Sequence, residues 1–278
     1  MKIWFITGAS RGFGALIAER ALQKGDGVVA TARSPRTVTE RFGTPPNLLA
    51  LPLDVTDEAR AHAAAKAAVD HFGRIDVLVN NAGFGLLGAV EEASAAEVEA
   101  VYRTNVFGLL AVTRAVLPHM RRQRAGRILN LSSLGGVRSA PGFGVYCSTK
   151  FAVEGLTEAL AAELTPLGIH VTAVEPGYFR TDFLDRTSLS VSAMQLDDYA
   201  ATAGAVRQEA KQLNHAQPGD PSKLAAVVVN FVDAPNPPVR LPLGSDTVAA
   251  IEDKRCDYAT LLAEWRVAAV ATDFAEVR

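Results

Sequence analysis

The sequence predicts a single α/β domain in which a mostly parallel sheet is covered by helices on both faces. Short β-branched runs alternate with longer Ala-rich helical patterns, and the short runs are apolar throughout, as in strands buried on both faces. A glycine-rich turn joins the first run to the first helical pattern. At 278 residues the chain can build one large core, so we expect residues 1–278 to form one domain.

The predicted elements follow one another in a regular order. Residues 2–7 form an apolar run that is too short for a signal-peptide core and leads straight into glycines, so they are a buried strand. An amphipathic helix is expected over 15–24. Six further strands are predicted at 27–32, 48–53, 76–80, 126–132, 170–176 and 238–243.

Two stretches break the alternation. Residues 178–220 carry turn formers, scattered apolar residues and weak helical periodicity, which is longer than an ordinary connection and predicts a lid over the site. Residues 246–278 follow the last strand and predict additional helices, a C-terminal helical extension.

The composition describes an ordinary globule with a formal net charge of -2, which leaves no basic excess to attract nucleic acid or an anionic membrane. The apolar stretch 225–232 is far below the roughly 18 residues of a membrane span. The two cysteines and five histidines show no disulfide framework and no metal-ligand spacing. We expect a cytoplasmic protein without a metal, whose partners are small molecules or copies of itself.

The turn "TGASRGFG" spans residues 7–14, directly after the first strand and directly before the first helix. Such a turn points backbone N–H groups and a helix N-terminus at an anion, and glycine lets a pyrophosphate approach the backbone. A glycine-rich turn with no ligand is the alternative, and the strand and helix context favours the phosphate site.

The spacing Gly8, Gly12, Gly14, together with "LDVT" at 53–56 and "NNAG" at 80–83, resembles the short-chain dehydrogenase/reductase family. The resemblance covers residues 2 to about 182, with several motifs in order. It implies a doubly wound Rossmann fold with seven strands in the order 3-2-1-4-5-6-7, and a nicotinamide cofactor.

The resemblance also implies which residues contact the cofactor. Those expected to line its phosphates are Gly8, Ser10, Gly12, Phe13 and Gly14. Those expected at the adenine and on the nicotinamide side are Asp54, Val55, Asn81, Gly83, Pro176, Gly177 and Thr181. Two readings stay open: Asp54 could instead cap the helix that begins near Asp57, and "NNAG" could be a strand-end turn whose role is largely structural.

Tyr146 and Lys150 in "GVYCSTK" lie four positions apart at the start of a predicted helix and therefore share one face. A phenol with a pKa near 10 is a poor general base at neutral pH, and lowering this pKa by about 3 units needs roughly 4 kcal/mol. A positive charge at about 4 Å supplies about that much at an effective dielectric near 20. A solvent-facing pair is the alternative, but "NLSS" at 130–133 ends the preceding strand at the edge where parallel sheets place their sites.

The family's spacing assigns two further catalytic residues. Ser133, thirteen positions before Tyr146, is expected to be the catalytic serine in place of its neighbour Ser132. Asn105 in "TNVFG" matches an asparagine that distorts its helix and helps to hold a proton-relaying water in the family. Cys147 is expected to be a small core residue on another helix face.

Two arginines predict NADP(H) as the cofactor. NAD-selective members of this fold place an acid at the end of the second strand, where this chain has Ala32. Arg33 follows immediately, and Arg11 projects from the glycine turn. Both match basic residues that hold the 2′-phosphate in NADP-dependent family members.

We therefore expect reversible hydride transfer between NADP(H) and a carbonyl or alcohol carbon. Apolar residues in 178–220 and after Ser133 predict a bulky, neutral substrate; they are Leu134, Val137, Phe143, Phe179, Phe183, Leu184, Leu189, Val191, Met194, Leu196 and Tyr199. The alternatives are a cofactor-binding regulator without turnover and a nucleotide-sugar epimerase or dehydratase. The resemblance further implies a homodimer or homotetramer.

Overall fold

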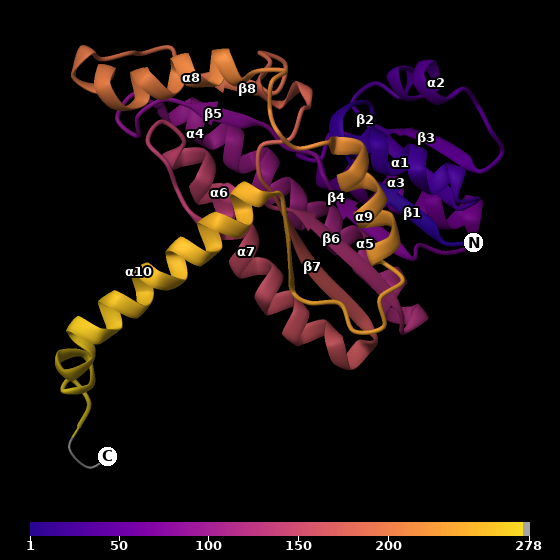
Figure 1. The fold of residues 1–278 in the computed structure, drawn as a ribbon. Coiled ribbons are helices and arrows are strands. Elements are labelled where there is room, and N and C mark those ends of the chain that lie inside the picture. Colours follow the sequence, from indigo (N-terminus) through magenta and orange to yellow (C-terminus); the bar gives the residue numbers. More distant parts are fainter. Residues whose placement is uncertain (275–278) are drawn as a thin grey trace.

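The computed structural model describes residues 1–274 and has one α/β domain built on a seven-stranded sheet (Figure 1). The strands of this sheet are β1 (Ile3–Ile6), β2 (Gly27–Ala32), β3 (Leu48–Pro52), β4 (Val77–Asn80), β6 (Gly126–Leu131), β7 (Ile169–Pro176) and β9 (Arg240–Leu243). Their spatial order is β3-β2-β1-β4-β6-β7-β9, and every neighbouring pair is parallel. The seven predicted strands and the Rossmann order are confirmed.

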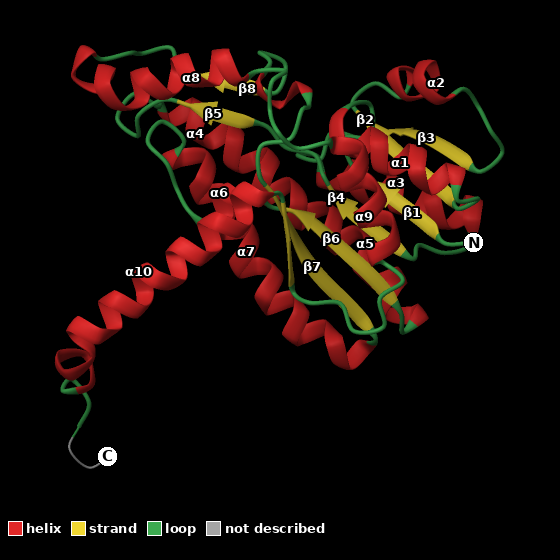
Figure 2. Cartoon of the chain, viewed as in Figure 1, coloured by secondary structure: helices red, strands yellow, loops and turns green. Residues whose placement is uncertain are grey.

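Helices cover both faces of this sheet, as predicted (Figure 2). The α-helices are α1 (Gly12–Gln23), α2 (Arg36–Phe42), α3 (Glu58–Phe72), α4 (Ala95–Tyr102), α5 (Leu109–Gln123), α6 (Leu134–Val137), α7 (Gly144–Leu164), α8 (Ala205–Leu213), α9 (Pro221–Phe231) and α10 (Ser245–Val270). One core cluster lies between the sheet, α1 and α9, and the other between the sheet, α3, α5 and α7. The first helix begins at Gly12, three residues before its predicted start, so the glycine turn and the helix N-terminus are continuous.

Strands that are apolar throughout contribute side chains to both core clusters. In β1, Trp4 and Ile6 pack into the cluster on the α1 side, whereas Ile3 and Phe5 pack into the other. Because successive side chains of a strand point to opposite faces, a strand covered on both sides is apolar at every position. Each of these four side chains is at most 1% exposed.

The segment 178–220 forms a separate layer over the carboxyl ends of the central strands. It contains β8 (Leu189–Val191), which pairs in parallel with β5 (Gly85–Leu87) as a second, two-stranded sheet, and it ends with α8. Arg207 of α8 donates two hydrogen bonds to the buried carboxylate of Glu92, at 2.6 and 3.2 Å, and so fixes this layer to the loop after β5. The small sheet could not be predicted, because three residues are too few to show the period of a strand.

The C-terminal extension is one helix, α10, where several were expected. It begins at Ser245 and runs for 26 residues, projecting from the domain as an arm (Figure 1). The predicted extension reaches residue 278, and 275–278 lie outside the described residues. Within residues 1–274, no helix combines the length and apolarity that crossing a membrane requires.

Candidate active site

A cavity of about 950 Å³ opens at the carboxyl ends of the central strands, beneath the segment 178–220. Its walls come from the glycine turn, the ends of β2, β4, β6 and β7, the start of α7, and residues 176–190. The predicted site residues that line it are Gly8, Ser10, Arg11, Gly12, Phe13, Arg33, Asp54, Val55, Asn81, Gly83, Ser133, Tyr146, Lys150, Pro176, Gly177 and Thr181. Gly14 and Asn105 are the two predicted residues that lie behind this lining.

The glycine turn offers free backbone donors to the cavity. Gly8 and Gly12 have φ values of 64° and 55°, in the left-handed region that favours glycine. Within the described chain, no side chain caps the N-terminus of α1 and its first turn holds no acid. A Cβ at Gly12 would meet nothing within 4 Å, whereas one at Gly14 would collide with the Gly8 carbonyl at 2.5 Å. Open space before uncapped N–H groups fits the pyrophosphate of a dinucleotide.

The "NNAG" segment ties the end of β4 to this turn. Asn81 donates its side-chain amide to the carbonyls of Thr7 and Gly8, at 2.8 and 3.1 Å. The backbone N–H groups of Asn81 and Ala82 both donate to the Thr7 hydroxyl, at 2.9 and 3.0 Å. Asn81 therefore has the structural role that was left open for this motif, since it links two segments of backbone. Asn81 also lines the cavity.

The residues after β2 and β3 form one end of the cavity. Asp54 accepts hydrogen bonds from the backbone N–H and the hydroxyl of Thr56, at 3.0 and 2.8 Å, and the first of these is the main reason that its pKa is lowered. Asp57 caps α3 instead, accepting from the Arg60 N–H at 3.1 Å, so the alternative that Asp54 caps this helix is wrong. Arg33 is exposed at the same end and lowers the Asp54 pKa through its charge.

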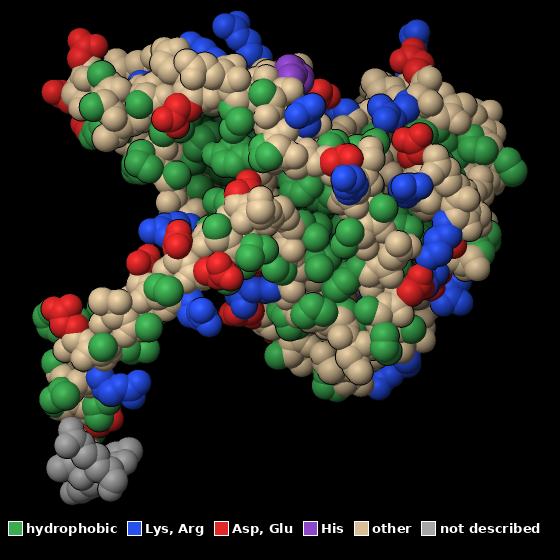
Figure 3. Space-filling view, viewed as in Figure 1, with side chains coloured by type: hydrophobic (Ala, Val, Ile, Leu, Met, Phe, Trp, Pro, Cys, Tyr) green, Lys and Arg blue, Asp and Glu red, His purple; other side chains and the backbone are tan. Residues whose placement is uncertain are grey.

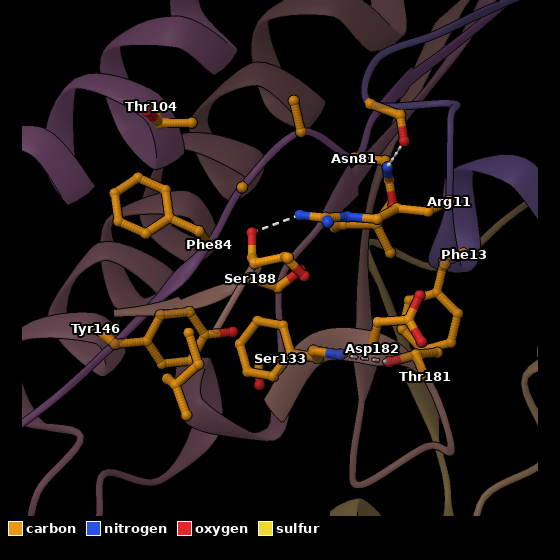
Figure 4. A pocket seen from close by; sticks show the side chains of 18 of the residues that line it. Arg11, Phe13, Asn81, Phe84, Thr104, Ser133, Tyr146, Thr181, Asp182 and Ser188 are labelled. Carbon is orange, nitrogen blue, oxygen red and sulfur yellow. Dashed lines mark hydrogen bonds between the residues drawn. The ribbon is translucent and has the colours of Figure 1, made fainter. Parts of the chain in front are cut away.

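Tyr146 and Lys150 lie one turn apart on α7 and face the cavity together, with the Lys150 Nζ 5.8 Å from the centre of the Tyr146 ring. Ser133 lies between β6 and α6, at the N-cap of α6. Its side chain hydrogen-bonds the Tyr146 hydroxyl and accepts a hydrogen bond from the Gly135 N–H at 3.0 Å. Figure 4 shows Tyr146 and Ser133 on one side of the cavity, with Arg11 and Phe13 across from them. Ser132 is buried beside Gly136 instead, so the spacing selected the serine that meets the phenol.

Burial has the largest effect on the pKa values of this pair. Burial raises the pKa of the Tyr146 phenol above its ordinary value, and the hydrogen bond to Ser133 offsets only part of this. Burial also lowers the pKa of Lys150 to about 8, against the opposing charge of Glu154. The raised pKa keeps the phenol protonated at neutral pH. The Lys150 Nζ donates to the Leu131 carbonyl at 2.7 Å.

Asn105 lies in a π-helical turn, Arg103–Gly108, between α4 and α5. Its side chain accepts from the Phe84 N–H at 3.0 Å and donates to the Phe84 carbonyl at 2.9 Å, pairing with the backbone as a strand would. A Cβ at Gly83 would lie 3.0 Å from Asn105 Oδ1 and 3.9 Å from Lys150 Nζ. The irregular turn, which often marks a functional site, therefore brings Asn105 and Lys150 to the same glycine.

The opposite wall shows how the lid segment meets the glycine turn. The Arg11 guanidinium donates to the Thr187 carbonyl at 2.5 Å, and the Phe13 ring packs edge-on against Phe179 with the ring centres 5.6 Å apart. Thr181 caps a short 3-10 turn, accepting from the Phe183 N–H at 3.3 Å. The predicted cofactor residues Arg11 and Phe13 are thus also contacts of the layer above.

The inner end of the cavity is apolar. Of the residues expected to form this wall, those that line the cavity are Leu134, Phe143, Phe179, Phe183, Leu184 and Leu189. The expectation is wrong for Val137, Val191, Met194, Leu196 and Tyr199, which lie outside the lining. Cys147 does line it, beside Tyr146, and burial raises the pKa of its thiol. The sequence alone could not give the depth of each lid residue, because the lid has no regular period.

A buried group of charges behind Lys150 was not anticipated. Glu154, one turn after Lys150 on α7, and Glu175 of β7 are 6% and 0% exposed. Arg240 of β9 lies 3.1 Å from the Glu154 carboxylate and 3.4 Å from that of Glu175. Burial, followed by the charge of Glu154, raises the pKa of Glu175 to about 7. The spacing of Tyr146, Lys150 and Glu154 at four-residue intervals could have revealed the first of these acids.

Replacing Glu175 with glutamine should remove a loss of stability as pH rises. The pKa of Glu175 is raised from 4.5 to about 7 in the folded protein, so the folded state binds a proton more tightly than the unfolded state does. The resulting stabilisation of the folded state is fully present below pH 4.5 and is lost as the pH rises through 7. The loss is up to roughly 3 kcal/mol in the free energy of unfolding. Urea unfolding between pH 4.5 and 8 should therefore show a flatter profile for Glu175→Gln. Glu158→Gln, which removes the exposed partner of Arg240, is the control; equal slopes for Glu175→Gln and wild type would contradict the prediction.

Comparisons with known proteins agree with this geometry. The family described as short chain dehydrogenase matches residues 2–191. The chain is 42% identical over 250 residues to Oxidoreductase BOA17 of Botryotinia fuckeliana, covering 89% of this chain and 90% of that protein. It is 40% identical over 247 residues to 3-ketodihydrosphingosine reductase of Bacteroides thetaiotaomicron, covering 87% and 88%.

Solved structures share the fold, and two of the three described here hold a nicotinamide cofactor. A short-chain dehydrogenase from Streptomyces avermitilis superposes with a TM-score of 0.90 at 40% identity, covering 98% of this chain and 99% of that one. A Burkholderia phymatum short-chain dehydrogenase/reductase in complex with NAD has a TM-score of 0.82 at 25% identity, covering 94% and 95%. A serine dehydrogenase complexed with NADP⁺ has a TM-score of 0.72 at 28% identity, covering 87% and 94%. The chain belongs to the short-chain dehydrogenase family of oxidoreductases.

Proposed function

We propose that this protein is an NADP(H)-dependent reductase that interconverts a ketone or aldehyde and an alcohol on a bulky, mostly apolar substrate. The observation that carries the proposal is one continuous cavity that begins at the glycine turn and Arg33, passes Ser133 and Tyr146, and ends among apolar side chains. A dinucleotide and a substrate could therefore meet at the phenol.

The polar residues have separate roles in this proposal. The nicotinamide supplies or accepts a hydride when it is bound. Ser133 donates a hydrogen bond to the carbonyl oxygen, and Tyr146 gives its proton to the alkoxide that develops there. A phenol kept protonated by burial suits this donation, which is the direction of ketone reduction. Lys150, with Asn105, holds the polar end of the cavity, where its ammonium would bind the ribose hydroxyls of the nicotinamide nucleotide.

The apolar end carries the proposed substrate class. Phe143, Phe183 and Leu189 lie in one apolar cluster with Tyr146, and the Phe183 ring centre is 5.5 Å from that of Tyr146. Such a wall binds hydrocarbon surface next to the reacting carbon. The Bacteroides relative is a reductase whose name specifies a long-chain substrate, which supports the same class here. The cavity lining also includes five arginines, of which Arg138, in the loop after Ser133, is paired with Asp253 and Asp257.

A substrate panel tests this proposal. Oxidation of NADPH should be faster, by at least about tenfold in kcat/KM, with long-chain or steroid-like ketones than with short hydroxy-acid precursors or charged sugars, because only the former bury apolar area. Phe183→Ala should reduce kcat/KM for the bulky ketones and leave that for a short ketone nearly unchanged. A panel in which charged sugars perform best would contradict the substrate class. Cofactor binding with no turnover of any compound would favour the regulator, and product formation without net cofactor oxidation would favour the epimerase or dehydratase.

A further inference from the structure

Among residues 1–274, the arm formed by α10 contacts the domain through its N-terminal half, and Tyr258 and Leu261 border a groove that Val137 and Phe151 of the body also line. Thr247 and Ala250 are buried against the body, and the Lys254 Nζ donates to the Val137 carbonyl at 2.5 Å. Arg138 forms ion pairs with Asp253 and Asp257, at 3.7 and 3.3 Å. Every residue from Arg255 to Thr272 is exposed. Figure 3 shows this part of the arm clear of the body, with hydrophobic side chains along it.

The exposed part carries a seam of apolar residues at coiled-coil spacing. Ile251, Tyr258, Leu262 and Trp265 follow one another at intervals of seven, four and three, the pattern of alternating core positions in a heptad. Tyr258, Leu262 and Trp265 are 55%, 49% and 56% exposed, and Leu261 beside them is 50% exposed. Because helices in proteins gain most of their stability by packing an apolar face, and exposed apolar patches mark interaction surfaces, the seam fits a second helix packed along it.

We propose that the α10 helices of two copies of this chain pair antiparallel through this seam, about a two-fold axis near Thr260. In this register Leu262 packs beside Tyr258 of the second copy, and Trp265 stacks on the Arg255 guanidinium of the second copy. Ala259 and Leu261 meet their own counterparts at the axis. Each contact occurs twice, as a two-fold interface requires.

The charges beside the seam select this register. Glu252 and Arg266 occupy the same flanking position two heptads apart, so the antiparallel register places Glu252 against Arg266 of the second copy, and the reverse. Shifting one helix by seven residues along the other breaks both Glu252–Arg266 contacts. In one direction this shift places Glu252 against Asp273 of the second copy, which has the same charge. Parallel pairing places Arg255 against itself. The 26-residue helix is about 39 Å long, so antiparallel pairing places the two domains toward opposite ends of the pair.

Glutamate substitutions on the two sides of the arm test the surface. Trp265→Glu and Leu262→Glu should each halve the mass measured by light scattering after gel filtration, relative to wild type at the same concentration. Val267→Glu is the matched control, since Val267 is 84% exposed and lies off the seam, and it should keep the wild-type mass. Halving relative to wild type covers both a dimer that becomes a monomer and a tetramer that becomes a dimer. An unchanged mass for Trp265→Glu, or a wild-type protein that is monomeric at every concentration, overturns the proposal.

Charge reversal tests the register. Glu252→Arg and Arg266→Glu each bring like charges together and should raise the dissociation constant of the pair at least tenfold. The double variant restores opposite charges and should regain wild-type affinity. Circular dichroism of each variant checks that the fold is kept, as expected for side chains that do not pack on the domain. If the double variant associates no better than either single variant, the antiparallel register is wrong.

Discussion

Replacing Tyr146 with phenylalanine should lower kcat for ketone reduction at least about 100-fold, the lower end of what a positioned acid or base contributes. The change removes one oxygen from a side chain that is 7% exposed and packed against Phe143 and Phe183, so the cavity keeps its shape. Binding of NADPH, measured by fluorescence titration, should be nearly unchanged. The loss should therefore appear in kcat, measured as NADPH oxidation with a substrate that the wild type reduces.

Tyr102→Phe is the control for this experiment. The Tyr102 hydroxyl forms a hydrogen bond of 2.8 Å with the hydroxyl of Ser148, which lies on the same helix as Tyr146. Both Tyr102 and Ser148 lie outside the cavity lining, so loss of the Tyr102 hydroxyl should leave kcat close to that of wild type. Wild-type kcat in Tyr146→Phe would show that another group donates the proton.

The main sheet could be predicted from the sequence because its physics is local. Strands such as Ile3–Ile6 are apolar at every position, and the alternation of Trp4 and Phe5 between two buried cores explains why. The meeting of Tyr146, Ser133 and the glycine turn could be predicted as well, since parallel strands bring their carboxyl ends to one edge.

Contacts that depend on the fold as a whole could not be predicted. The β5–β8 pairing joins residues about 100 positions apart through three-residue strands, which carry no period of their own. Glu175 reads as one acid in an apolar strand, and only the fold places Glu154 and Arg240 against it. The raised pKa of Tyr146 has the same origin, because burial is a property of the surrounding elements and not of the spacing to Lys150.

Replacing Arg33 with alanine should abolish most of the preference for NADPH over NADH that we propose for this protein. Arg33 follows Ala32, which ends β2 where an acid would bind the ribose hydroxyl of NAD, and the charge of Arg33 contributes to the lowered pKa of Asp54. Charge-assisted hydrogen bonds contribute about 1.5–3 kcal/mol each. Because Arg33 is exposed, water and salt weaken its share, and the arginines together should give roughly a 100-fold preference for NADPH.

The expected signature of Arg33→Ala is a large rise in KM for NADPH with little change in KM for NADH. Arg11→Ala should cost less, because the Arg11 guanidinium also donates to the Thr187 carbonyl and is shared with the lid segment. Arg36→Ala is the matched control: its side chain is 84% exposed, pairs with Glu40 on α2, and lies outside the cavity lining. The fall in affinity should shrink as salt is added, since the lost contact is ionic. A wild-type enzyme with equal or higher kcat/KM for NADH would mean that Arg33 meets no phosphate, and the absence of an acid after β2 would then have to be explained without NADP.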